Sequence, residues 1–187
     1  MTRPETDSFG SELPEWLRAI PGPVDPATEG VRQRIGRISR QFERILATVA
    51  AEHDLSVGDW EALSALARSD DGASGVTPGR IGAILGLTSG TVSVRIDRLV
   101  RAGLLAHVEG DDGRARPVRL TTAGRAAWGA ATLTRTDTEA RLIGDALSSA
   151  EVDRLNILLG RLLARLDAEY GPAPRHDMTR GRRSGRG

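Results

Sequence analysis

The chain has 187 residues, of which 39% are hydrophobic and 27% are charged, and its formal net charge at pH 7 is +1. This composition predicts a soluble globular protein with one sizeable domain and helical extensions. Because cysteine is absent, disulfides, thiolate metal sites and thiol-based redox sensing are excluded. No apolar run approaches the roughly 18 residues of a membrane span, and residues 1–10 lack the apolar core of a signal peptide. We therefore expect the protein in the cytoplasm.

The charge is unevenly distributed. All 26 basic residues are arginine, and residues 77–125 hold eight of them against four acids. Residues 1–30 are acidic instead. Arginine binds phosphates and guanine edges through a planar fork of donors. A locally basic middle in a nearly neutral protein favours a polyanionic partner.

The N-terminal part predicts an arm followed by a long helix. Residues 1–30 contain five of the nine prolines, and they are expected to form an arm with one short helix, Pro14–Ile20. The first strong element spans residues 31–53. Its apolar residues recur at alternating steps of four and three, which predicts one apolar stripe on a helix. The stripe consists of Val31, Ile35, Ile38, Phe42, Ile45 and Val49.

The next three helices are predicted from their caps. Ser56 with Asp59 resembles a capping box and opens a helix whose inner face holds Trp60, Leu63 and Leu66. Thr77-Pro78 opens a short helix that ends at Gly86. Thr88 or Ser89 caps the following helix, which ends at Gly103 and turns Val92, Ile96 and Leu99 inward. A helix, a tight glycine-containing turn and a second helix form the helix-turn-helix pattern.

A hairpin and two long helices complete the prediction. Residues 104–108 and 117–120 read as strands joined by a turn-rich tip, which makes a wing. Thr121 or Thr122 caps a helix over roughly 123–145, and Ser148 with Glu151 opens a last helix to about Glu169. Residues 171–187 are expected to be a disordered basic tail. The last helix is apolar on a broad face, and the first helix has a matching seam, which favours a dimer over packing within one protomer.

Two segments resemble the multiple antibiotic resistance regulator (MarR) family. They are "LTSGTVSVRIDRLVRAGLL" and "DDGRARPVRLTTAGR", in which Asp112, Arg114, Leu120, Thr121 and Gly124 match the family's wing pattern. The resemblance covers roughly residues 31–168. It implies a mainly α fold with a small β-hairpin wing, in which a winged helix-turn-helix (residues 55–122) is joined to dimerisation helices (31–53 and 123–169). The whole domain would span residues 31–170 and form an intertwined helical dimer.

The resemblance also implies the function. Members of this family are homodimers that bind a pseudo-palindromic operator in duplex DNA, usually as repressors that a small phenolic or aromatic effector releases. The outer face of the 88–102 helix would enter the major groove, and Arg114 at the wing tip, oriented by Asp112, would enter the minor groove. The DNA-contacting residues expected here are Thr88, Ser89, Thr91, Ser93, Arg95, Arg98, Asp112, Arg114 and Arg116, with Val94 on the same face.

One branch of the family responds to urate and carries an extra N-terminal helix, and "SGTVSVRIDRL" is similar to its recognition helix. Trp16 and Arg95 match two of its ligand positions, whereas Glu61 replaces Asp and His107 replaces Arg. Histidine lacks the permanent positive charge that an anion needs, which argues against urate itself. An effector crevice would be lined by Trp16, Phe42, Trp60, Glu61, Arg95 and His107. The alternatives are a closed core without ligand, and a Trp16 that only fastens the arm.

Other function classes have less support. The three histidines stand singly and without metal-ligand spacing, so we expect neither a metal nor a cofactor. No nucleophile elbow, phosphate loop or pair of catalytic acids occurs, so we expect no enzyme. The main alternative to a DNA-binding regulator is a winged-helix module for protein–protein interaction, which would be expected to lack a basic recognition face.

Overall fold

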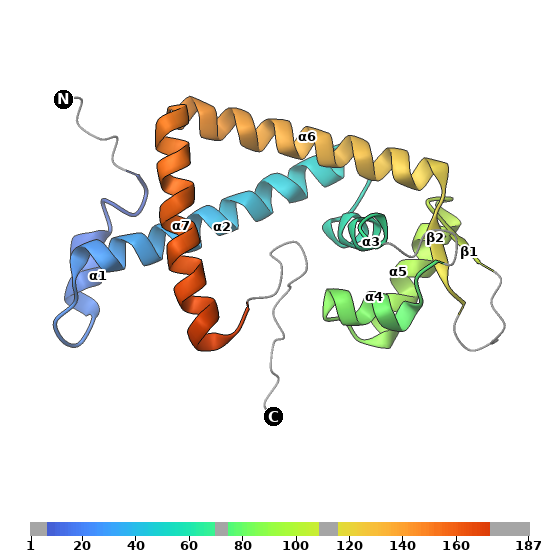
Figure 1. Ribbon diagram of the computed structural model, residues 1–187, viewed down its shortest axis with the longest axis horizontal. Helices are drawn as coiled ribbons and strands as arrows, with labels where there is room; N and C mark the ends of the chain where they lie inside the picture. Colours follow the sequence, from blue (N-terminus) through green and yellow to red (C-terminus); the bar gives the residue numbers. More distant parts are fainter. Residues whose placement is uncertain (1–6, 70–74, 109–115, 173–187) are drawn as a thin grey trace. The chain divides into compact units, whose positions relative to one another are not determined.

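A computed structural model describes residues 7–69, 75–108 and 116–172. Over these residues the protein is mainly helical with a two-stranded antiparallel hairpin, as the sequence predicted (Figure 1). Its contacts divide the chain into two compact units, residues 1–46 and 47–187, and the division falls inside a helix.

The N-terminal unit contains α1 (Leu13–Ala19) and most of α2 (Pro26–Glu52). Helix α2 begins at Pro26 and not at Val31, where the apolar stripe begins. The reason is local: the Asp25 carboxylate accepts a hydrogen bond from the Thr28 amide at 2.8 Å, and Pro26 occupies the first helical turn, where a missing N–H costs nothing. An Asp-Pro pair is therefore the start signal that the apolar periodicity did not reveal.

Residues before α1 are fastened to α2 mainly by charge. The Phe9 side chain is 2% exposed, and the guanidinium groups of Arg34 and Arg37 lie over its ring at 5.9 and 5.1 Å from the centroid. Arg34 also pairs with Asp7 at 2.6 Å, and Arg37 pairs with Glu12 at 2.5 Å. A cation held over an aromatic face and paired with a carboxylate fixes both partners.

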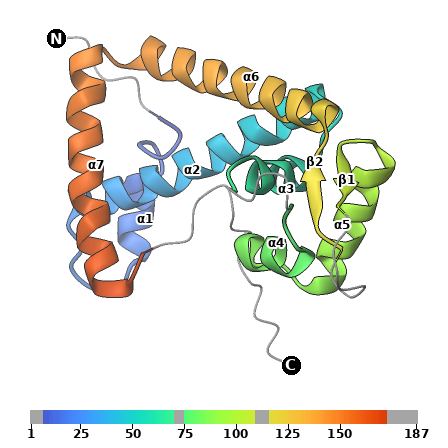
Figure 2. The same cartoon turned by 45° about the vertical axis from the view of Figure 1, so that its right-hand side comes forward.

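The second unit is built around three short helices, α3 (Val57–Ala67), α4 (Pro78–Leu85) and α5 (Ser89–Arg101). Their predicted caps are confirmed. Ser56 and Asp59 form a complete capping box, while the hydroxyls of Thr77 and Thr88 accept bonds from amides three residues on. The three helices pack against one another and beside the hairpin (Figure 2).

The wing is larger than the hairpin that the sequence predicted. Strands β1 (Leu105–His107) and β2 (Val118–Leu120) pair antiparallel, with Leu105 opposite Leu120. Val76, just before α4, adds a bridge to Val118 through two backbone hydrogen bonds of 2.8 and 2.9 Å. This bridge joins the segment that enters the helix-turn-helix to the wing.

The core of this unit lies where α3, α4, α5 and the hairpin meet. Leu63 and Val118 are fully buried, and each of the three predicted inward residues of α5 is at most 3% exposed. The predicted inner residues of α3 are also buried. The main buried side chains are Trp60, Leu63, Leu66, Ile81, Leu85, Val92, Ile96, Leu99, Leu105 and Val118.

Two long helices follow the wing, α6 (Thr122–Ala146) and α7 (Ser149–Tyr170). Thr121 caps α6 through the Gly124 amide, and Ser148 with Glu151 caps α7. A Cβ at Gly124 would collide with the Leu104 carbonyl oxygen, so the start of α6 requires glycine to pack on the wing. No helix of the described chain is long and apolar enough to cross a membrane.

Helix α7 buries no residue. The side chains of its apolar stripe are between 41% and 45% exposed at Leu155, Leu159, Leu162 and Leu166. The stripe of α2 is similarly uncovered at Val31, Ile35 and Ile38, which are 52%, 40% and 53% exposed. Helices α2 and α7 therefore each present an apolar stripe that is not covered by other residues of its own unit.

Candidate nucleic-acid interface

The turn between α4 and α5 is fixed by two glycines. Gly86 ends α4 with φ of +62°, and the Leu87 amide bonds back to the Gly82 carbonyl at 3.0 Å. A Cβ at Gly82 would stand 3.2 Å from the Leu87 carbonyl oxygen and 3.3 Å from Val92. Helix α5 thus starts in close contact with α4, and its direction is set by backbone geometry as well as by its apolar face.

The first turn of α5 presents small polar groups to solvent. Thr88, Ser89, Thr91 and Ser93, all predicted to contact DNA, are exposed. The Thr88 hydroxyl caps the helix and also lies 3.0 Å from the Thr91 hydroxyl. Short side chains at the start of a helix allow its backbone to approach a groove closely.

Arg95 does not lie on the outer face, where the sequence placed it. Its guanidinium is paired with Glu61 of α3 at 3.4 Å, and the two side chains are only 16% and 12% exposed. A Cβ at Gly58 would collide with the same guanidinium. Position 95 falls at the edge of the buried face, and the absence of a side chain at Gly58 lets the arginine fold inward against α3. In this arrangement Arg95 holds α5 to α3.

Arg98 is also drawn towards α3, although half of its side chain remains exposed. It forms an ion pair with Asp59, whose side chain is 5% exposed, and its Nη2 donates to the Ser56 hydroxyl at 2.7 Å. The α3 capping box and the α5 arginine therefore form one polar cluster. The second Asp59 oxygen, Oδ1, is buried without a hydrogen-bond partner. Without Arg98, the nearly buried carboxylate of Asp59 would lose its positively charged partner, which is costly for a buried charge.

The structure brings three further residues onto the exposed face of α5. Gly90, Asp97 and Arg101 are exposed beside Ser93 and Val94, at steps of three and four residues. The Arg101 Nε donates to the Asp97 carbonyl at 3.3 Å. Helical spacing from Ser93 places all three on this face, whereas the pattern of hydroxyls and arginines near the helix start does not indicate them.

Arginines flank this face within the same unit. Arg80 on α4, Arg116 before β2 and Arg119 within β2 are all exposed. Arg116 was predicted as a DNA contact, whereas Arg80 and Arg119 were not. Asp112 and Arg114 lie outside the described residues. The described chain therefore carries exposed arginines on α4, which packs against α5, and on the wing, whose strand β1 packs against α5.

The residues predicted to line an effector crevice have differing environments. Trp60 is 2% exposed, its indole N–H donates to the Thr132 hydroxyl at 3.1 Å, and Arg135 lies 4.6 Å above its ring. Its indole is thus engaged in packing between α3 and α6. Glu61 and Arg95 form the ion pair between α3 and α5, whereas His107 is exposed at the end of β1.

Trp16 and Phe42 belong to the N-terminal unit. Phe42 is half-buried on α2, and Trp16 is 42% exposed. The Trp16 indole donates to Glu29 at 2.6 Å. Hydrogen bonds from Arg32, then Gln33 and Trp16, lower the pKa of Glu29 to about 2. The fastening role considered for Trp16 thus has a defined partner in Glu29.

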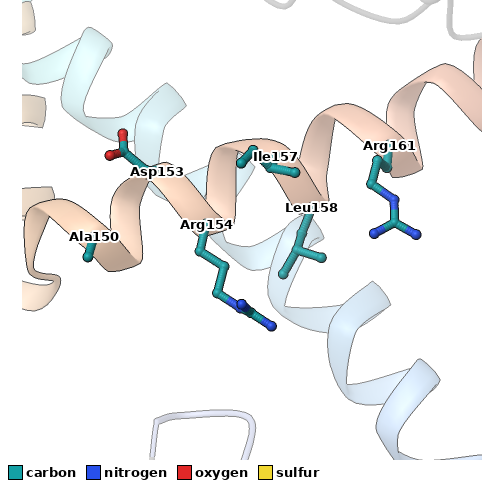
Figure 3. Close-up of a pocket in the computed structure, with 6 residues that line it drawn as sticks. All are labelled: Ala150, Asp153, Arg154, Ile157, Leu158 and Arg161. Carbon is teal, nitrogen blue, oxygen red and sulfur yellow. The ribbon is translucent and has the colours of Figure 1, made fainter.

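A shallow depression of about 410 Å³ runs along α7 (Figure 3). All of its lining residues come from this one helix, so it has no opposing wall that could enclose a ligand. A binding pocket for a small molecule normally encloses most of its ligand. The depression is lined by Ala150, Asp153, Arg154, Ile157, Leu158 and Arg161.

Residues 53–115, which span α3 to the wing, match the family model described as the MarR family. A solved mutant MarR from E. coli superposes with a TM-score of 0.62 at 22% identity, covering 76% of this chain and 99% of that one. The chain has the MarR-family fold. A comparison with curated protein sequences finds no match.

Two further structures share the MarR-family fold. One is MepR, a transcription regulator of the Staphylococcus aureus multidrug efflux pump MepA, with a TM-score of 0.64, 23% identity and coverage of 71% of this chain and 95% of that one. The other is a S. aureus MepR mutant bound to an oligodeoxyribonucleotide, with a TM-score of 0.56, 25% identity and coverage of 73% and 97%. The fold is therefore shared with a protein solved on DNA.

Proposed function

We propose that the chain is a DNA-binding transcription regulator of the MarR family, and that it acts as a homodimer. The observation that carries this proposal is α5, a helix whose inner face is buried at Val92, Ile96 and Leu99 while its small polar residues face solvent beside a wing. A second helix of a helix-turn-helix presented in this way fits the major groove. Exposed arginines on α4 and at the wing would add contacts to phosphates.

The dimer is supported by the exposed apolar stripe of α7. Four leucines along α7 are each more than 40% exposed. An apolar stripe of this length is too extensive for a helix face that remains in water. A second copy offers the same stripe, and a twofold arrangement pairs like with like. A twofold dimer then requires two half-sites related by symmetry, about one helical turn of DNA apart, ~34 Å.

The direct test is fluorescence anisotropy with the full-length chain and a duplex taken from upstream of its own gene. We expect saturable binding that weakens steeply with salt, since each neutralised phosphate contributes a slope of about −0.9 in a log–log plot. A duplex of scrambled sequence is the matched control. Equal affinity for both duplexes at physiological salt would contradict a sequence-specific regulator, and no binding to either would favour the protein–protein interaction module.

We further propose that the protein represses and that a phenolic or aromatic effector releases it from DNA. The support is the largely buried pair of Arg95 and Glu61, which joins α5 to α3. An anionic effector that competes for Arg95 would loosen this connection. The effector must bind the DNA-free conformation more tightly, and a coupling of roughly 1–3 kcal/mol would change operator affinity about 5- to 150-fold.

This switch is tested by repeating the anisotropy titration with salicylate, other phenolic acids and urate. We expect a phenolic acid to weaken operator binding in the wild type and to have less effect on the Glu61→Gln variant, in which Arg95 has no carboxylate to release. His107 makes urate the weaker candidate, and urate as the only active compound would overturn that preference. Compounds that bind, as seen by tryptophan fluorescence, without changing DNA affinity would contradict a release mechanism.

A further inference from the structure

The ion pairs to α3 determine which part of α5 is left to face a duplex. Arg95 and Arg98 are directed towards Glu61 and Asp59, and the apolar side of the helix is buried. Apart from Ser89 and Thr91, which are exposed in the first turn, what remains is one continuous stripe along the helix. In chain order it consists of Gly90, Ser93, Val94, Asp97 and Arg101, all exposed.

Val94 is the apolar member of this stripe, with 69% of the residue exposed. Its isopropyl group lies among polar residues in the middle of the helix and is not part of the buried core. In the major groove, the one apolar feature on a base edge is the C5-methyl group of thymine. A branched aliphatic side chain that contacts this methyl excludes water from both groups.

Asp97 is the one acid within α5, and it lies one helical turn beyond Ser93 and Val94. Its carboxylate is a poor neighbour for phosphates, so its place in the complex is against base edges. Cytosine and adenine present amino donors in the major groove, but adenine also presents the N7 acceptor, which repels a carboxylate. The chemistry of Asp97 therefore selects the N4 amino group of cytosine.

Gly90 permits the approach that these contacts need. A Cβ built at Gly90 meets nothing within 4 Å, so the fold itself does not require glycine there. Without a side chain, the first turn can approach the groove more closely. Val94 and Asp97 are three residues apart, about 4.5 Å along the helix axis, which is comparable with the ~3.4 Å rise of one base pair.

We propose that Val94 and Asp97 read neighbouring base pairs of each half-site, Val94 through a thymine methyl and Asp97 through a cytosine amino group. Arg95 and Arg98 then act as positioning residues that hold α5 on α3. This inference rests on the proposed function, because it names the bases that the same helix recognises in duplex DNA.

The experiment is selection of bound duplexes from a random library by the full-length wild type, followed by the same selection with two variants. Asp97→Asn should change the selected base from cytosine to adenine at one position per half-site, because an amide bonds adenine in a bidentate manner. Asp54→Asn is the matched control: it removes one exposed charge outside α5, and its φ of 56° suits asparagine. It should leave the selected motif unchanged.

Val94 is tested on the selected duplex by replacing each thymine in turn with deoxyuridine, which removes only the methyl group. One position per half-site should weaken wild-type binding about fourfold, the effect of exposing one buried methyl, and Val94→Ala should abolish this sensitivity. If the wild type selects no motif, the proposed function fails and this inference fails with it. If a motif is selected but neither variant changes base preference or methyl sensitivity, the function stands and the inference is overturned.

Discussion

Helices α5 and α7 are both amphipathic, but only α5 finds its apolar partners within its own unit. Val92, Ile96 and Leu99 of α5 are at most 3% exposed, whereas no residue of α7 is buried. An apolar stripe specifies that a helix must be covered, and it does not specify by what. The winged helix is thus complete in one chain and keeps an exposed polar face, the one that we propose binds DNA. Helix α7 instead keeps an apolar face, which a second copy would cover.

The largest expected effect is the loss of the dimer when the α7 stripe is made acidic. In Leu159→Asp/Leu162→Asp, four leucines per dimer no longer leave water, at about 1.5–3 kcal/mol each. The dimer dissociation constant should therefore rise by at least ~10⁴-fold. Sedimentation velocity on the full-length chain measures this change. Operator affinity should fall with it, because each monomer reaches only one half-site.

The matched control adds the same charge to the opposite side of the helix. Ile157 is 64% exposed and Ala164 is also exposed, and both lie away from the leucine stripe. Ile157→Asp/Ala164→Asp should remain dimeric. If both double variants dimerise equally well, α7 is not a subunit interface, and the contrast between the two helices would lose its explanation.

A second prediction contrasts the two faces of α5 by itself. Ile96→Ala leaves a cavity in the core of the winged helix and should lower the free energy of unfolding by about 2–5 kcal/mol. Val94→Ala, on the exposed face, should change it by less than about 0.5 kcal/mol. Urea denaturation followed by circular dichroism measures both. A comparable loss in Val94→Ala would mean that Val94 packs against the fold, and its role in reading DNA would have to be abandoned.

Much of the second unit could be predicted from local signals. The caps at Ser56, Thr77, Thr88 and Thr121 act within three residues, so the sequence places the helix starts directly. The apolar periodicity likewise identified the buried face of α5. The overall winged-helix architecture then followed from the order of these elements and from the resemblance to the MarR family.

The orientation of the arginines could not be predicted in this way. Arg95 lies at the edge of the apolar face, and whether its long side chain turns inward or outward depends on Glu61 and on the missing side chain at Gly58. Both are more than 30 residues away in the sequence. Asp59 was identified only as a capping residue, because a capping box is local whereas its ion pair with Arg98 is not.

Helix α1 sharpens the comparison, because it buries no residue yet has a polar partner. Trp16 donates to Glu29, whose pKa is lowered to about 2 from an ordinary value of 4.5. A lowered pKa means that Glu29 stabilises the folded unit fully above about pH 4.5 and loses this effect as the pH falls towards 2. The indole N–H resonance of Trp16 should therefore stay unchanged between pH 7 and about 3.5. The Trp16→Phe variant assigns this resonance, and two-dimensional ¹H–¹⁵N NMR spectra recorded at each pH follow its chemical shift.

The Trp60 indole gives an internal reference for this titration, because its acceptor is the Thr132 hydroxyl, which does not titrate in this range. An unchanged Trp60 resonance shows that the second unit remains folded while Trp16 is followed. Glu29→Gln should shift the Trp16 resonance at pH 7, since the charge-assisted bond becomes a neutral one. A Trp16 midpoint near pH 4.5 in the wild type would mean that Glu29 is not held by Arg32 and Gln33. The hydrogen bond from Trp16 to Glu29 would then add little to the attachment of α1 to α2, and α1 would resemble α7, which buries no residue.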